Sequence, residues 1–240
     1  MNRIDYLTKD GLKIIQHPEV FSFSVDALLL GHFATLPKKG HIVDLCAGNG
    51  AVGLLASQRT EANITMIELQ ERLANMAKES VILNHKEEQI QVIQAPLQDG
   101  LSYIEHDSVD AIVCNPPYFA TSKTSKQNPN PYLAIARHEI YTNLDDIMTL
   151  AKQLLKTRGK ITLVHRPDRL LDIIQAMTKA NIEAKTLRFI YPKEGKEANM
   201  LLIEGVKGGK KSGLKVLPPF IVHHQDGRYT EEMEAIFQHG

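Results

Sequence analysis

The chain has 240 residues, 43% of them apolar, and its 28 basic and 28 acidic side chains balance to a formal net charge of zero. That length is sufficient for a buried core without disulfide or metal staples, and the balanced charge excludes a uniformly basic or acidic surface. The chain has no signal-peptide pattern and no run of 18 apolar residues, so we expect a cytoplasmic protein without a membrane span. Cys46 and Cys114 lie outside any CxxC or Cys/His cluster, so we expect neither a disulfide framework nor a metal site.

The first forty residues precede any regular alternation and contain "FSFSVDALLLGHFA" (21–34), a pattern that predicts one helix. From residue 41 onward, short β-type apolar runs alternate with longer helical patterns. This alternation predicts an α/β fold, with a mostly parallel sheet and helices on both faces. We expect seven strands, over 41–46, 63–69, 90–95, 109–115, 160–166, 184–191 and 199–206, and helices over 50–59, 70–85, 144–157 and 168–181.

The last two expected strands are separated only by a short loop containing Pro192 and Gly195. A connection this short permits only antiparallel pairing, so we expect a terminal hairpin on the otherwise parallel sheet. The polar, proline-broken stretch 121–131 predicts a loop. No repeat and no second domain is visible, so residues 1–240 are interpreted as one domain, in which residues 1–40 are an extension that helps to form the ligand cleft.

A glycine-rich loop, "DLCAGNGAVG", joins the first core strand to its helix. Gly48, Gly50 and Gly53 spell GxGxxG, and Glu68 closes the next strand twenty residues after Gly48. This spacing is typical of a dinucleotide site, in which the acid meets a ribose hydroxyl, so an oxidoreductase is one interpretation. The glycines alone could also serve only a tight turn.

Asp44, four positions before Gly48, argues for a different ligand. A carboxylate facing the mouth of the loop repels a pyrophosphate and attracts the sulfonium and ammonium groups of S-adenosylmethionine. Two unit charges a few ångströms apart interact by roughly 1 to 4 kcal/mol between bulk water and a protein surface. We therefore expect S-adenosylmethionine as the cofactor. The alternatives without a role in ligand binding are that Asp44 caps a neighbouring backbone group and that Glu68 is merely solvated.

The motif "NPPYF" (115–119) follows the fourth core strand and should open onto the same crevice as the glycine loop. A planar NH₂ group is a poor nucleophile because its lone pair is delocalised. The Asn115 side-chain oxygen and the Pro116 carbonyl can accept its two hydrogen bonds and stabilise the positive charge that grows during attack, which makes them the candidate catalytic groups. The prolines stiffen the backbone, and Tyr118, with Phe119, offers a ring for stacking. The bland interpretation is a tight turn after a strand.

"DLCAGNG", Glu68 and "NPPYF" together resemble the class I S-adenosylmethionine-dependent methyltransferases that modify exocyclic or amide nitrogens, which have a Rossmann-like fold. From about Ser22 to Tyr229 the chain is similar to the bacterial valine tRNA adenine-N6 methyltransferases, on the segments "FSFSVDALLLGHFA", "ARHEIYTNLDDIM", "YPKEGKEANMLLIEG" and "KKSGLKVLPPFIVHH". The resemblance implies a catalytic acceptor site of Asn115, Pro116 and Tyr118. It implies a cofactor site of Ser24, Asp26, Asp44, Gly48, Gly50, Glu68 and Asn115.

One position departs from the family pattern. Such enzymes often place an acid after the third strand to hold the amino group of the cofactor's adenine, whereas Pro96 stands there in this chain. Asp99 or backbone groups are the candidates to replace it.

A local basic surface is predicted near the chain's C-terminal hairpin. Between Lys185 and Lys215 the sequence holds eight basic and three acidic side chains. Basic loops beside a stacking ring suit single-stranded RNA, whereas a run of lysines can equally be a solvated face. The residues expected to bind the RNA substrate are Pro117, Tyr118, Phe119, Lys123, Lys210 and Lys211.

Transfer of a methyl group to the N6 amino group of an anticodon-loop adenine, with tRNA as the partner, is thus the first interpretation. A protein glutamine N5-methyltransferase or an rRNA amino-group methyltransferase uses the same chemistry, although the glutamine enzymes carry a longer helical segment before the glycine loop. A dinucleotide-dependent oxidoreductase and a non-catalytic RNA-binding protein are two more distant interpretations.

Overall fold

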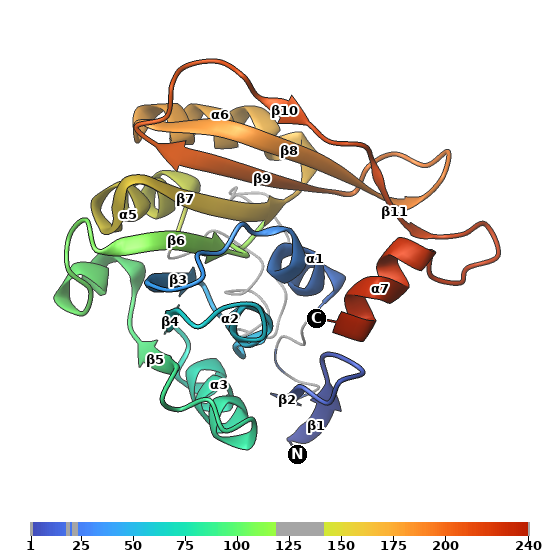
Figure 1. Ribbon diagram of the computed structural model, residues 1–240, viewed down its shortest axis with the longest axis horizontal. Helices are drawn as coiled ribbons and strands as arrows, with labels where there is room; N and C mark the ends of the chain where they lie inside the picture. Colours follow the sequence, from blue (N-terminus) through green and yellow to red (C-terminus); the bar gives the residue numbers. More distant parts are fainter. Residues whose placement is uncertain (1, 18–19, 21–23, 119–141, 240) are drawn as a thin grey trace, which may run out of the picture.

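In the computed structural model, residues 2–17, 20, 24–118 and 142–239 are described, and their main sheet has nine strands (Figure 1). The strand order is β10-β8-β9-β7-β6-β3-β4-β5, and β11 also pairs with β8. The strands are β3 (His41–Leu45), β4 (Asn63–Glu68), β5 (Ile90–Gln94), β6 (Val109–Cys114), β7 (Leu155–His165), β8 (Ile182–Lys193), β9 (Met200–Lys207), β10 (Lys215–Val216) and β11 (Phe220–His223).

The sheet is parallel except for β9, which runs antiparallel to both β7 and β8. The expected terminal hairpin is therefore present as β8 and β9. The expectation of seven strands misses β10 and β11, which pair in parallel with β8. These strands have only two and four residues and flank the prolines of "VLPPF", so neither shows an alternation long enough to predict a strand.

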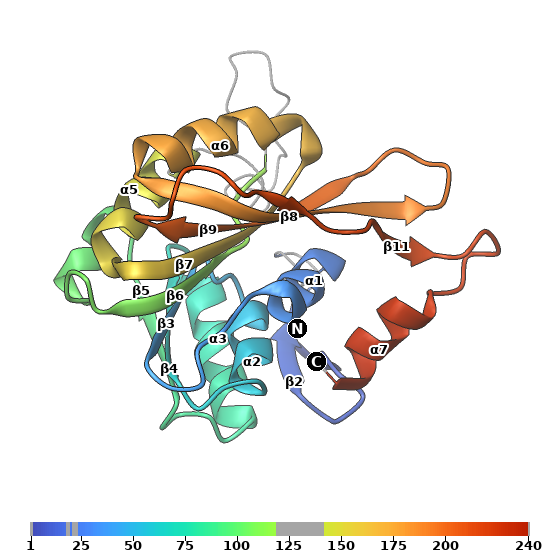
Figure 2. The ribbon, with the colours of Figure 1, turned by 45° about the horizontal axis from the view of Figure 1, so that its top comes forward.

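Helices cover both faces of the sheet (Figures 1 and 2). One core cluster joins the sheet to α1 (Val25–Phe33), α2 (Ala51–Ser57), α3 (Glu71–Leu83) and α7 (Glu231–His239). A second cluster joins the opposite face to α5 (Leu144–Leu154), α6 (Leu170–Lys179) and the 3₁₀ turn η1 (Leu97–Ser102). Alternate residues of each strand belong to alternate clusters, as the pleat requires: Ile42 lies in the first and Val43 in the second.

The N-terminal segment forms a small separate sheet, β1 (Arg3–Tyr6) paired with β2 (Lys13–Gln16), which the sequence patterns did not predict. Side chains from outside this hairpin satisfy the backbone of β2. Asn84 bonds both the N–H and the carbonyl of Lys13, Ser80 accepts from the Ile15 N–H, and Asn49 of the glycine loop donates to the Ile15 carbonyl. The hairpin is thereby fixed against α3 and against the glycine loop.

The boundary between α5 and β7 differs most from its prediction. The helical pattern over 144–157 ends as α5 at Leu154, and β7 begins directly at Leu155 rather than at Lys160. Leu155 pairs with Val109 of β6, so sheet pairing overrides the local helical pattern. No helix in the described part of the chain is long and apolar enough to cross a membrane.

Candidate active site

Strand pairing brings three sequence motifs to one edge of the sheet. In the register of β3, Leu45 pairs with Ile67 of β4 on one side and with Cys114 of β6 on the other. The glycine loop, Glu68 and Asn115 each follow or end one of these strands. They therefore lie beside one another at the carboxyl edge, where ligands bind in open α/β sheets.

The glycine loop has the conformation that its residues allow. Gly48 and Gly50 have φ angles of 59° and 90°, in the left-handed region that favours glycine, and Gly50 is the N-cap of α2. A Cβ at Gly48 would meet nothing within 4 Å, so this point of the loop faces open space. A Cβ at Gly50 would lie 3.2 Å from the Ala77 Cβ and the Met66 sulfur. Gly48 thus serves the open side of the loop, and Gly50 its packing side.

Glu68 fixes the glycine loop through hydrogen bonds to the backbone. Its Oε2 accepts from the Gly48 N–H at 2.8 Å and its Oε1 accepts from the Gln70 N–H at 2.8 Å. The side chain is buried, and burial raises the pKa of the Glu68 carboxyl, opposed by these backbone N–H groups. Each carboxylate oxygen has a second lone pair, so Glu68 can still accept a ligand hydroxyl. A merely solvated Glu68 does not fit this geometry.

Asp44, which the sequence predicts at the mouth of the glycine loop, is completely buried. Its Oδ2 accepts from the Gly53 N–H of α2 at 2.9 Å, so it also caps a neighbouring backbone group. No described residue gives a hydrogen bond to Oδ1. Burial raises the pKa of Asp44 to about 8, and the nearby Glu68 charge raises it further against the opposing Gly53 hydrogen bond. A cationic ligand would relieve this unfavourable burial.

Two other buried oxygens near this edge have no hydrogen-bond partner among the described residues: Ser24 Oγ and Gln70 Oε1. Ser24 is the N-cap of α1, yet its hydroxyl does not cap the helix. Buried polar groups are nearly always paired, so these oxygens mark places where a ligand's donors would bind. Gln70 was missed from the sequence; its position two residues after the strand-ending acid is the signal that could have found it.

The acceptor motif connects to the N-terminal helix. The Tyr118 hydroxyl lies 2.5 Å from Asp26 Oδ2 and 2.7 Å from Asn115 Oδ1. Pro116 and Pro117 stand between Asn115 and Tyr118 and fix that short stretch of backbone. Arg169 NH1 donates to the Tyr118 carbonyl at 3.4 Å. Tyr118 is therefore tied at both its backbone and its hydroxyl, and Asp26 contacts the acceptor motif, which the resemblance alone did not imply.

His165, at the end of β7, adjoins this motif and was also missed from the sequence. Its ring lies 5.2 Å from the Tyr118 ring, tilted by 47°. Its Nδ1 accepts from the Arg166 N–H, and within the described ranges its buried Nε2 has no partner. Burial, with the charge of Arg169, lowers the pKa of His165 to about 4. A neutral imidazole thus packs behind the acceptor tyrosine.

Of the predicted RNA-binding residues, Pro117 and Tyr118 belong to this site, whereas Lys210 and Lys211 lie away from it. Lys210 and Lys211 follow β9, whose last residue, Lys207, bonds Asp107 beside the start of β6. Because β9 is antiparallel, its loop lies at the amino edge of the sheet, opposite Asn115. The basic loop therefore does not flank the acceptor motif. Phe119, Lys123 and the loop 121–131 lie outside the described residues.

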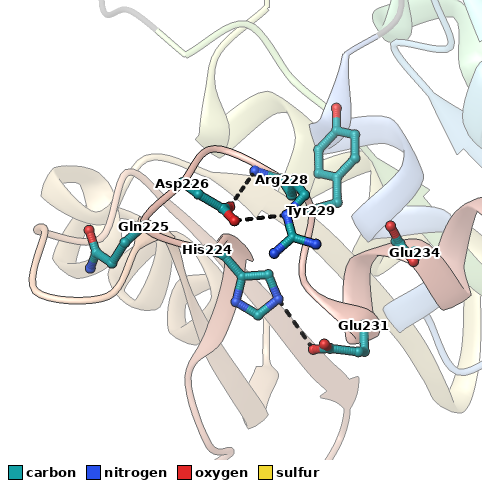
Figure 3. A pocket seen from close by; sticks show the side chains of 7 residues that line it. All are labelled: His224, Gln225, Asp226, Arg228, Tyr229, Glu231 and Glu234. Atoms are coloured by element: carbon teal, nitrogen blue, oxygen red, sulfur yellow. Dashed lines mark hydrogen bonds and ion pairs between the residues drawn. The ribbon is translucent and has the colours of Figure 1, made fainter.

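A separate shallow pocket of about 530 Å³ lies at the turn between β11 and α7 (Figure 3). Its Arg228 is paired with Asp226 at 2.7 Å, and His224 lies 3.4 Å from Glu231 (Figure 3). Acids outnumber bases in its lining once Glu234 is included, which does not suit a phosphate backbone. None of the residues that line this pocket belongs to the glycine loop or to the acceptor motif of residues 115–119.

A family model, described as the methyltransferase small domain, matches residues 11–188, well over half of the chain. The chain belongs to this methyltransferase family. A relative from Shewanella sp. (strain W3-18-1), named tRNA1(Val) (adenine(37)-N6)-methyltransferase, is 30% identical over 216 residues, 90% of each chain.

Solved structures show the same fold. The crystal structure of a predicted O-methyltransferase from Agrobacterium tumefaciens superposes with a TM-score of 0.70 at 21% identity, covering 90% of this chain and 98% of that one. Geranyl diphosphate C-methyltransferase from Streptomyces coelicolor, in complex with Mg²⁺, geranyl diphosphate and S-adenosyl-L-homocysteine, gives a TM-score of 0.57 at 12% identity, covering 76% and 79%. The expected class I methyltransferase and its Rossmann-like fold are confirmed.

The cofactor of this methyltransferase is S-adenosylmethionine. The residues present fit it. An open glycine turn, two buried carboxylates and two unpartnered buried oxygens offer acceptors to a ligand that carries positive charge and hydroxyl groups. The dinucleotide-dependent oxidoreductase is excluded by the family.

Proposed function

We propose that this methyltransferase transfers a methyl group to the exocyclic N6 amino group of an adenine in tRNA, in the anticodon loop of valine tRNA. The observation that carries the proposal is the pairing of Leu45 with Cys114, because it sets the cofactor loop after β3 directly beside Asn115 after β6. The name of the Shewanella relative supports the choice of substrate.

In this proposal Asn115 Oδ1 and the Pro116 carbonyl accept the two N–H bonds of the target amine, with Pro117 bracing the turn. Two acceptors aimed at one nitrogen draw its lone pair out of conjugation and stabilise its developing positive charge. Pro116 has no N–H that would compete with the amine. The methylated amine is acidic and loses its proton readily, so the motif needs no strong base. The cofactor supplies an electrophilic methyl group on a positively charged sulfur.

We assign the cofactor to the cradle formed by the glycine loop, the end of β4 and the start of α1. Gly48 leaves room for the ligand, Gly50 lets the loop pack closely against the protein beneath it, and Glu68 accepts from the ribose of the cofactor. The Asp44 carboxylate, buried and short of one hydrogen bond, favours the cationic end. Residues 1–40 contribute to this cleft through Ser24 and Asp26. The residues proposed to form the cofactor site are Ser24, Asp26, Asp44, Gly48, Gly50, Glu68 and Asn115. Of these, Asp26 and Asn115 border the acceptor side, where both lie against the Tyr118 hydroxyl, and contribute little to cofactor affinity.

Residues 1–240 are proposed to act as one methyltransferase domain, with tRNA as the partner and the cytoplasm as the compartment. Tyr118 and Phe119 are the proposed stacking residues, where one ring under a base contributes about 1 to 3 kcal/mol. An anticodon-loop base is already partly unpaired, so extruding it costs less than the few kcal/mol of a duplex base.

The experiment is methyl transfer from tritiated S-adenosylmethionine to unmodified tRNA transcripts, rRNA fragments and a protein lysate, followed by mass analysis of digested nucleosides. We expect label in valine tRNA as N6-methyladenosine. Asn115→Ala should lower kcat by at least a hundredfold while the Kd for the cofactor changes little, because Asn115 acts on the acceptor. Asn63→Ala, at an exposed strand start, is the matched control. Label in protein glutamine or only in rRNA would refute the tRNA assignment.

A further inference from the structure

Three polar groups from two distant segments meet at the acceptor site. The Tyr118 hydroxyl oxygen is 2.5 Å from Asp26 Oδ2, across 92 positions of sequence, and 2.7 Å from the Asn115 side-chain oxygen. Both distances lie within hydrogen-bond range, and the shorter one is typical of a bond to a charged acceptor. Asp26 belongs to the first turn of α1, and Asn115 follows β6 directly.

A hydroxyl has a single proton, so Tyr118 can donate to only one of these two oxygens. A carboxylate is the stronger acceptor, because hydrogen bonds to an ionised group are roughly twice as strong as neutral ones. The proton of Tyr118 therefore belongs to Asp26. Burial, together with the Asp26 charge and hydrogen bond, raises the pKa of Tyr118 well above its usual value, so the phenol stays a donor.

The second short contact then requires a proton from Asn115. The oxygen and nitrogen of an amide exchange places by a half-turn of the side chain, and their positions follow from the surrounding hydrogen bonds. With its NH₂ directed at the phenol oxygen, the amide satisfies that contact and points its carbonyl oxygen away from Tyr118. That carbonyl is the group that has to receive the target amine.

On the basis of the proposed function, we propose that Asp26 is a positioning residue that acts through the Tyr118 hydroxyl to keep the carbonyl oxygen of Asn115 free for the substrate amine. Without Asp26, Asn115 is the one acceptor left to the hydroxyl among the residues that the structure describes. It then donates to the amide oxygen, which turns the amide NH₂ toward the substrate. Two NH₂ groups facing each other cannot form the hydrogen bond that transfer needs.

This relay predicts an unusual pattern in kinetics. Asp26→Ala should lower kcat by about tenfold or more, equivalent to about 1.4 kcal/mol of transition-state stabilisation. Tyr118→Phe, which removes the competing hydroxyl, should lower kcat less. The double variant should match Tyr118→Phe alone, so the second substitution restores activity lost by the first. Asp26→Asn keeps an acceptor for the hydroxyl and should retain more activity than Asp26→Ala.

The controls separate the relay from other roles of Asp26. In Asp26→Ala, the cofactor Kd measured by calorimetry should stay within about threefold of wild type. In free energy this is less than half of the effect expected from a tenfold fall in kcat. A rise in Kd as large as the fall in kcat, or a double variant as poor as the product of the single ones, would overturn the proposal. Glu88→Ala, an exposed acid on another surface, controls for the loss of one charge.

A measurement without RNA tests the same contact. In protein labelled at the tyrosine Cζ, the ¹³C signal missing from Tyr118→Phe identifies Tyr118, and its shift follows ionisation of the phenol. In Asp26→Ala that ionisation should move to lower pH, because the neighbouring carboxylate is gone. An unchanged titration would refute the relay. If the wild-type enzyme labels no RNA while this titration shifts as expected, the substrate assignment fails and the Asp26–Tyr118 contact stands.

Discussion

Replacement of Asp44 by asparagine tests the most consequential buried group of the cofactor site. Asn keeps an oxygen for the Gly53 N–H and removes the ionisable carboxyl. The folded-state pKa of Asp44 is raised from 3.8 to about 8, a difference of about four units, or about 6 kcal/mol at full extent. Between these two values the folded protein binds more protons than the unfolded chain. Wild-type stability is therefore lost as pH rises from about 4 to about 8.

The expected numbers follow from that window. At pH 7, the raised pKa of Asp44 lowers the free energy of unfolding by about 4 kcal/mol relative to a protein in which this carboxyl stays protonated. Between pH 5 and pH 8 this loss grows by about 4 kcal/mol. The new NH₂ in Asp44→Asn lacks a partner, which costs about 1 to 3 kcal/mol. At pH 7 the variant without cofactor should thus gain about 1 to 3 kcal/mol in the free energy of unfolding.

Urea unfolding of both proteins at pH 5, 7 and 8 measures this difference, because other titrating groups cancel in the comparison. A difference between the two proteins that stays constant across these pH values would refute the burial reasoning. Calorimetry of S-adenosylmethionine binding at pH 7 in two buffers of unlike ionisation enthalpy should show release of about 0.9 proton in wild type. Asp44→Asn should release markedly fewer protons and bind the cofactor more weakly.

The remaining predictions concern the acceptor side, the loop and the lysines. The pKa of His165 is lowered to about 4 in the folded state, so its contribution to the free energy of unfolding is complete above pH 6.5 and is lost as pH falls toward 4. In urea unfolding, His165→Leu should therefore lose about 3 kcal/mol less stability than wild type over this pH range. Gly53→Ala would place a Cβ 2.4 Å from the Met66 methyl and 3.2 Å from both the Met66 Cγ and the Asp44 Oδ2. The methyl can turn away, but the other two atoms are held in the core, so we expect a loss of about 1 kcal/mol of stability, measured by thermal unfolding. The Lys210→Ala/Lys211→Ala variant should bind valine tRNA within about twofold of wild type in filter binding, because its loop lies at the far edge of the sheet; a loss above about tenfold would contradict this.

The sequence by itself determined the fold class and the place of both motifs. Runs such as "HIVDLC" and "VDAIVCN" are apolar because each strand is buried on both faces, so the alternation with helices already predicts a parallel sheet. Gly48 and Gly50 predict a tight turn after the first core strand, and the structure has both at positive φ, which glycine adopts without strain. These signals are local: they depend on residues a few positions apart.

What the tertiary structure decided depends on residues far apart in the chain. Tyr118 meets Asp26 across 92 positions, and Asp44 is buried because α2 packs over it, neither of which any local pattern encodes. The lysines after β9 lie at the amino edge of the sheet, away from the acceptor site, because β9 is antiparallel and reverses the chain. The preceding strand, β8, ends at the carboxyl edge, where the acceptor site lies. Charge, burial and proton sharing are properties of neighbours in space, and only the folded chain selects those neighbours.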